Sequence, residues 1–196
     1  MVLGSHVIFG VYGFWLPNDE RGSWSEFVGA WELYRYGPAT KTAERRSLAA
    51  RHHNVAARMA AKRALKRPAV HLSGIQARAV GRGFAEYSAD SGLSIWACAI
   101  LPDHIHLVLG RHRLKVEQLA IQLKGAASRH PISEGIHPFG DYAMPHDTPP
   151  KCFAVVEWKV YLTSDEDIER SVKYVELNPL KEGKPLQHWK FVRRPF

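Results

Sequence analysis

The stretch 93–110, LSIWACAILPDHIHLVLG, constrains the fold more than any other part of the chain. It holds two apolar runs joined directly at Pro102-Asp103, and a connection this short predicts two neighbouring antiparallel strands. Residues two apart on a strand point to the same side, so His104 and His106 share one face while the aliphatic residues that alternate with them share the other. The stretch therefore predicts a central hairpin with one apolar face and two imidazoles on the opposite face.

The remaining elements predict an α+β fold. Further strands are expected at 5–12, 69–74 and 153–162, and helices at 42–66, 75–92, 116–130 and 164–179, the last two ending before or at a proline. This order favours a ferredoxin-like βαββαβ sandwich, with a mainly antiparallel central sheet and helices on one face. We expect one domain over 1–196, with an extended insertion at about 17–70 and a basic C-terminal tail at about 184–196.

Composition narrows the class of protein. Of the 196 residues, 45% are hydrophobic and 23% are charged, which is typical of a globular domain. No apolar run approaches the roughly 18 residues of a membrane span, and the N-terminal residues lack a basic, cleavable leader. Two cysteines far apart, Cys98 and Cys152, predict neither a disulfide framework nor a zinc site. We therefore expect a cytoplasmic protein with no membrane partner.

Positive charge is concentrated in one segment. The net charge is +8, and residues 41–82 hold eleven Lys or Arg against one acid. Such a segment is typical of proteins that bind polyanions, because each phosphate contact releases counterions. The candidate DNA contacts are Arg51, Arg58, Lys62 and Arg63, with Lys124 and Arg129 expected to line the same groove. A solvated face of a basic helix is the alternative reading.

The two histidines of the hairpin have two interpretations. Imidazoles that start about 7 Å apart on one face of a strand can converge on a divalent metal ion. Alternatively, His104 and His106 are partly buried side chains that bond to nearby polar groups, which is the commoner role of an isolated H-x-H. The pair alone does not decide between these interpretations.

A second pattern lies on the predicted helix 164–179. Its start carries an S-x-x-D capping pattern, and its apolar stripe runs along one side. Tyr174 and Asn178 fall one turn apart on the flank of that stripe. A phenol at the edge of the core, beside an amide that can bind a metal, is a plausible nucleophile for phosphorus. The alternative is an ordinary core-edge tyrosine and an asparagine that ends the helix before Pro179.

Together the two motifs, in this order, resemble the single-tyrosine HUH endonucleases. More narrowly, LPDHIHLVL and YVELNPLKEGK are similar to the motifs of the transposases of insertion sequences and of repetitive extragenic palindromes. The resemblance covers roughly residues 93–183. Two features depart from the family: Asp103 stands where an asparagine is usual, and the 17–70 segment is longer than in compact members.

The resemblance implies an activity and a site. His104, His106 and Asn178 would bind a divalent ion, Mg²⁺ or Mn²⁺. Tyr174 would attack single-stranded or hairpin DNA to form a 5′-phosphotyrosine, and no nucleotide cofactor would be needed. Relatives are monomers or homodimers, so either state is expected. Two alternatives remain: an idle HUH domain that binds DNA as a regulator, and an RNA-binding protein of ferredoxin-like fold.

Overall fold

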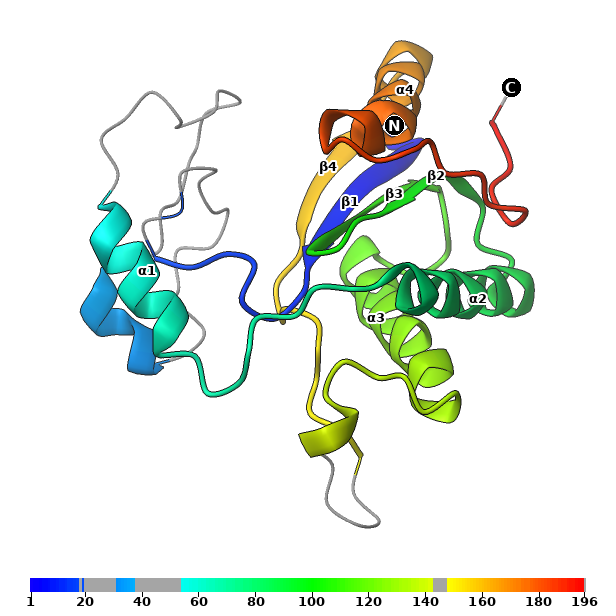
Figure 1. Cartoon of the computed structure of the whole chain (residues 1–196). Helices are drawn as coiled ribbons and strands as arrows, with labels where there is room; N and C mark the ends of the chain where they lie inside the picture. Colours follow the sequence, from blue (N-terminus) through cyan, green and yellow to red (C-terminus); the bar gives the residue numbers. More distant parts are fainter. Residues whose placement is uncertain (18, 20–30, 38–53, 143–147, 196) are drawn as a thin grey trace.

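A computed structural model describes residues 1–17, 19, 31–37, 54–142 and 148–195. One sheet of four antiparallel strands, in the order β2-β3-β1-β4, forms its centre (Figure 1). The strands are β1 (Gly4–Gly10), β2 (Ile95–Ile100), β3 (His104–Gly110) and β4 (Trp158–Leu162). The predicted hairpin β2–β3 is confirmed, and β1 pairs with β3, so that the histidine strand lies inside the sheet.

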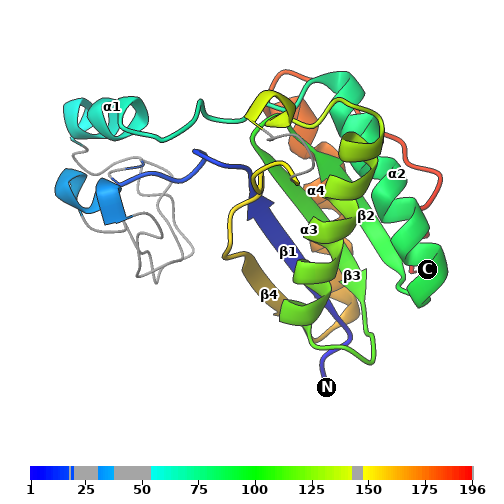
Figure 2. The same cartoon turned by 90° about the horizontal axis from the view of Figure 1, so that it is seen from below.

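The sheet order and the helix crossovers confirm the ferredoxin-like prediction. Helix α2 (Gly74–Ser91) connects to β2 and helix α3 (Val116–Ser133) connects β3 to β4, and both cover one face (Figure 2). Helix α4 (Asp165–Lys181) packs on the opposite face, against β2 and β3. The expectation that helices share one face therefore holds for α2 and α3 and is corrected for α4, because both faces of the sheet carry apolar side chains.

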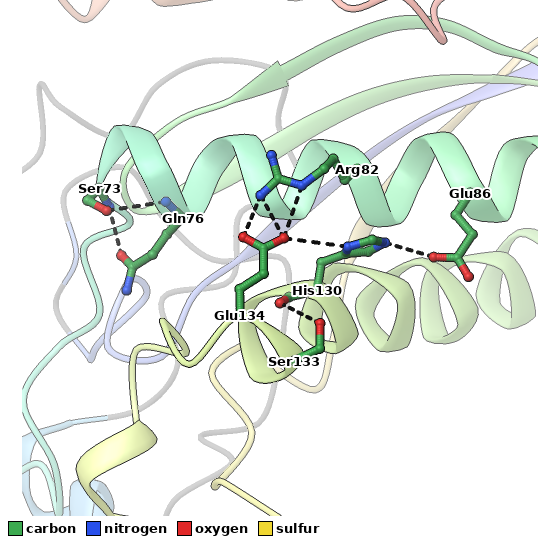
Figure 3. A network of polar contacts seen from close by, with 7 residues as sticks. All are labelled: Ser73, Gln76, Arg82, Glu86, His130, Ser133 and Glu134. Atoms are coloured by element: carbon green, nitrogen blue, oxygen red, sulfur yellow. Dashed lines mark hydrogen bonds and ion pairs between the residues drawn. The ribbon is translucent and has the colours of Figure 1, made fainter.

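Helices α2 and α3 approach each other closely at a glycine. A Cβ on Gly83 would lie 2.2 Å from the carbonyl oxygen of Ala126, so only glycine fits between the two backbones. Polar contacts also join the two helices, where Glu134 accepts from Arg82 and His130 Nε2 lies 2.8 Å from Glu86 (Figure 3). This glycine, which weakens the helix by propensity, is required by the packing.

The described part of the insertion is a small unit beside the sheet (Figure 1). Helix α1 (Val55–Arg63) and a 3₁₀ helix, Trp31–Tyr36, pack around the buried side chains of Leu16, Leu33 and Ala61. The predicted helix at 42–66 is thus helical over 55–63 and ends three residues earlier than predicted, and 42–53 lie outside the described residues. In the segment 69–74, predicted as a strand, residues 69–73 form instead a linker and Gly74 begins α2.

That linker fastens the insertion to one end of the sheet. Val70 N–H donates to the carbonyl of Tyr12, after β1, and Leu72 N–H donates to the carbonyl of Pro102, in the β2–β3 turn. The backbone of the linker is therefore bonded to the end of the sheet where the histidine strand begins. These bonds run to irregular segments instead of a strand, which explains why the linker is not part of the sheet.

The C-terminal tail runs along the β2 edge of the sheet. The Gln187 side chain accepts from Ile100 N–H at 2.9 Å and donates to the Ile100 carbonyl at 2.8 Å, which imitates a neighbouring strand. Arg193 N–H donates to the carbonyl of Ile95, and Trp189 packs against Gly81 of α2. The tail thus covers an exposed strand edge, which is otherwise prone to pair with other chains.

Element ends differ from the sequence prediction in three places. The prolines Pro131 and Pro179 lie inside the last turns of α3 and α4, where a missing N–H removes a single helical bond. Strand β4 is shorter than predicted, and only an isolated bridge between Val11 and Phe153 extends the pairing upstream.

In the part of the chain that the structure describes, no helix has the length and apolarity to cross a membrane.

Candidate active site

The site is centred on His104 and His106, which point from β3 toward α4. Strand alternation places them on the face of Val108, which packs against α4, and opposite the face that meets α2 and α3. Both side chains are buried, and their ring centroids lie 4.8 Å apart. The predicted convergence of the pair is therefore present.

A neighbouring group contacts the Nδ1 atom of each imidazole. His104 Nδ1 lies 2.7 Å from Oδ1 of Asp103, and the Phe14 ring stacks on the His104 ring at 4.8 Å. His106 Nδ1 lies 3.1 Å from Nε2 of His6. These contacts fix the ring orientations, and both leave Nε2 as the nitrogen that remains for another ligand. Asp103, the departure from the family pattern, thus orients the first histidine of the pair.

His6, on β1, was missed by the sequence analysis. In the β1–β3 register His106 pairs with Ile8, so His6 is its diagonal neighbour on the same face. A histidine at an alternate position of the predicted first strand was a visible signal. Whether that histidine lies beside His106 depends on the register between two strands a hundred residues apart, and the sequence does not give that register.

Tyr174 reaches the histidines from α4. Its ring centroid lies 5.6 Å from that of His106 and 5.8 Å from that of His6, while 41% of the residue stays exposed. Burial raises the pKa of the phenol above its ordinary value, and the Asn178 amide opposes this to a smaller degree. Lys181 Nζ lies 4.2 Å from the centre of the tyrosine ring. One side of the Tyr174 side chain is therefore exposed to solvent, and the other side contacts Lys181, His106 and His6.

Lys181 is a second site residue that the sequence analysis did not name. It follows Tyr174 by seven residues, two helical turns, and so lies on the same helix face. Spacing alone could have indicated it. The charge of its ammonium group also helps to lower the pKa of His106, so Lys181 acts on both Tyr174 and the histidine pair.

Asn178 is buried, and its Oδ1 atom has no hydrogen-bond partner among the residues that the structure describes. An unpaired buried carbonyl oxygen is rare, because it costs about 1–3 kcal/mol. Among the described residues no three His, Cys, Asp or Glu side chains are grouped to hold a metal ion. A cation at this site would therefore need a ligand of another kind besides His104 and His106, and an amide oxygen suits Mg²⁺ or Mn²⁺.

Burial also sets the protonation of the histidines. It lowers the pKa of His6 to about 4 and holds the pKa of His106 well below its ordinary value. Desolvation is the main cause for both, and the charges of His104, His6 and Lys181 add to it at His106. His106 is therefore neutral at pH 7, the form that binds metals.

The structure separates the predicted DNA contacts into three groups. Arg58, Lys62 and Arg63 lie on α1, while Arg51 falls outside the described residues. Arg129 is exposed on α3, on the sheet face away from Tyr174. Helix α3 and the histidines therefore occupy opposite faces of the sheet, and the DNA contact of Arg129 stays a prediction.

Lys124, also on α3, has a structural partner instead. Its Nζ donates to Glu157 at 2.9 Å and to the carbonyl of Val155 at 2.8 Å, with only 12% of the side chain exposed. These contacts fasten the segment before β4 onto α3. A largely buried ion pair of this kind leaves little room for a phosphate, which corrects the prediction for Lys124.

Comparison with known proteins gives similarities of fold. No protein-family model and no curated protein matches the sequence. The REP-associated tyrosine transposase, solved bound to a REP hairpin, aligns over 93% of this chain and 70% of its own, with 12% identity and a TM-score of 0.47.

A candidate transposase from Deinococcus radiodurans R1 aligns over 90% of both chains, with 15% identity and a TM-score of 0.39. Identities and TM-scores of this size do not assign an activity to the chain. The function must therefore be argued from the residues of the site.

Proposed function

We propose that the protein is a transposase-like enzyme that nicks and rejoins single-stranded or hairpin DNA through a covalent tyrosine intermediate. The observation that carries this proposal is the gathering of His104, His106 and Tyr174 on one face of the sheet, with the orphaned Asn178 oxygen one helical turn from the tyrosine. These side chains come from two elements almost seventy residues apart. The fold therefore brings the histidine motif of β3 next to the tyrosine motif of α4, which are separate in the sequence.

His104, His106 and Asn178 would hold a divalent ion, Mg²⁺ or Mn²⁺. Such an ion would polarise a phosphoryl oxygen and offset the negative charge that develops during phosphoryl transfer. The carboxylate of Asp103 accepts from Nδ1–H of His104, which leaves the Nε2 lone pair of His104 for that ion. The Nε2 lone pair of His106 is available when His106 Nδ1–H donates to Nε2 of His6. A neutral His106 and the unpaired amide oxygen of Asn178 thus suit the role.

Tyr174 would supply the nucleophile. Its Oη forms a bond to phosphorus as the bond to the 3′ oxygen breaks, and the phenolic proton passes, directly or through water, to the departing 3′ oxygen. The products are a 5′-phosphotyrosine and a 3′-hydroxyl. Attack by another 3′-hydroxyl reverses the step and rejoins DNA, so the energy of the broken bond is conserved. The exposed part of the ring is the side that a strand could approach.

Lys181 would assist by charge. An ammonium group beside the ring favours negative charge on the phenol and on the attacked phosphate. Basic side chains on α1 would bind the phosphates of the flanking strand. Neither role requires a nucleotide cofactor.

The proposal is tested with labelled single-stranded and hairpin oligonucleotides, incubated with Mg²⁺, with Mn²⁺ or with EDTA. Denaturing gels should show a cleaved strand and a covalent adduct that needs the metal. Tyr174→Phe should abolish both, whereas Tyr161→Phe, at an exposed tyrosine on β4, should retain them. Tight DNA binding by the wild type without any adduct would favour the idle, regulatory alternative and reject the enzyme.

A further inference from the structure

A cavity of about 320 Å³ lies between α1 and the end of the sheet that carries the histidines. Its boundary includes Phe14, which stacks on His104, and Asp103, which contacts the same imidazole. The cavity therefore begins directly behind the first histidine of the site. Met59 and Lys62 of α1, a helix of the insertion, line the side of the cavity away from the sheet.

The wall of the cavity combines buried side chains inside with exposed side chains at its opening. Phe14, Leu16 and Val70 form an apolar part of the wall, and the buried carboxylate residue Asp19 lies beside them. Lys62 and Met59 are exposed and stand at the rim. A wall of apolar side chains and carboxylates with a cationic rim suits a ligand that has a flat body with hydrogen-bond donors and an attached anion.

The cavity is held in place by the linker bonds described above. Val70 bonds to the backbone that follows β1, and Leu72 bonds to the turn that contains Asp103. The insertion is thereby tied to the core next to the cavity. The cavity consequently lies at the end of the sheet where the histidine strand begins.

We propose that this cavity receives one unpaired nucleobase of the DNA strand, next to the nucleotide whose phosphate is attacked. The base would lie against Phe14, Leu16 and Val70, and its phosphate would meet Lys62 at the rim. A phosphate inside the cavity is disfavoured, because carboxylates of Asp19 and Asp103 line it, whereas a base can donate hydrogen bonds to such groups. The inference rests on the proposed function and gives the insertion a role in selecting the cleavage position.

The test measures binding, so that it does not depend on cleavage. The probe is a fluorescein-labelled DNA hairpin with single-stranded flanks, made as a series with one abasic site at each flank position. Dissociation constants are measured by anisotropy in a Tyr174→Phe background. One flank position should lose about tenfold in affinity when its base is absent, the size of one base–aromatic or base–apolar contact.

Met59→Trp should fill the cavity, since residue 59 is 43% exposed and can accept a larger ring. In this variant the abasic effect at that one position should disappear, while the other positions keep theirs. Lys62→Gln should weaken all members of the series equally. The matched control is Ala56→Trp, at an exposed site on the same helix outside the cavity, which should keep the wild-type profile.

A flat abasic profile, no affinity for the hairpin, or an unchanged profile in Met59→Trp would overturn the cavity proposal. Adduct formation by protein with an intact Tyr174 is measured separately on the same probes. An adduct together with a flat profile leaves the enzymatic proposal standing and rejects the cavity. A position-specific profile without any adduct supports a base-binding cavity and rejects the enzymatic proposal.

Discussion

At the scale of single residues, Asn178 shows most clearly how folding and function compete. A buried carbonyl oxygen without a partner lowers stability, and an apolar side chain of similar size would avoid that loss. Helix α4 nevertheless places this oxygen one turn from Tyr174. The proposed role as a metal ligand would account for the arrangement, because the lone pairs of such a ligand must be unpaired before the ion binds.

Asn178→Leu should therefore stabilise the metal-free protein and remove its response to metal. In EDTA we expect the free energy of unfolding to rise by about 1 kcal/mol, because the unpaired oxygen is gone. Mn²⁺ should raise the melting temperature of the wild type by binding the folded state, and should do so much less for the variant. Chemical denaturation and calorimetry measure the two effects. Equal Mn²⁺ shifts in both proteins would exclude Asn178 as a ligand.

Lys181→Met should slow adduct formation by about tenfold, since a nearby cation worth roughly 1.4 kcal/mol would be lost from the charged transition state. The measurement is a single-turnover rate of adduct formation at saturating DNA, with DNA affinity followed in parallel. Lys173→Met, at an exposed lysine next to the tyrosine in the same helix, is the matched control. Similar losses in both variants would indicate general charge effects instead of a role for Lys181.

At the scale of elements, backbone packing decides between two interior glycines with the same helix propensity. Gly83 of α2 faces the backbone of α3, so an added methyl group would collide with a carbonyl oxygen. A Cβ on Gly125 of α3 would meet only the end of the flexible Arg129 side chain, at 3.8 Å. The same substitution should consequently have opposite effects at the two positions.

Gly83→Ala should destabilise the protein by about 1–3 kcal/mol, because overpacking forces the helices apart. Gly125→Ala should stabilise it by about 0.5–1 kcal/mol through helix propensity alone. Urea unfolding of both variants provides the comparison, each serving as the control for the other. A stabilised Gly83→Ala protein would show that α2 and α3 are farther apart at Gly83 than the 2.2 Å approach to the Ala126 carbonyl oxygen requires.

At the scale of the whole molecule, the buried histidines make stability depend on pH. The pKa of His6 is about 4 in the folded protein, against an ordinary value of 6.5, so the unfolded chain binds the extra proton first as the pH falls. This contribution to stability is complete above about pH 6.5 and is lost between pH 6.5 and 4. The lowered pKa of His106 acts in the same direction.

Between pH 7 and 5, His6 alone should lower the free energy of unfolding by about 2 kcal/mol. Urea titrations at both pH values measure this change. His6→Gln should remove that part of the pH dependence, while His188→Gln, at an exposed histidine of the tail, should retain it. If His6→Gln retained the full pH dependence, the lost stability would have to come from other groups.

The sequence by itself determined the features that depend on local periodicity. Alternation on 93–110 placed His104 and His106 on one face, and helical spacing placed Tyr174 beside Asn178. The short connection at Pro102 dictated the antiparallel hairpin. A strand or helix imposes these relations on neighbouring residues whatever surrounds it, so they can be read without a structure.

Only the tertiary structure decided which elements meet. The register between β1 and β3 brought His6 to His106, and the packing of α4 on the second face brought Tyr174 and Lys181 to the same histidines. It also placed Lys124 in an ion pair on the opposite side. Such contacts join residues far apart in the chain and depend on sheet order and on the face that each helix covers. No local pattern encodes them, because they arise from the burial of the whole apolar surface at once.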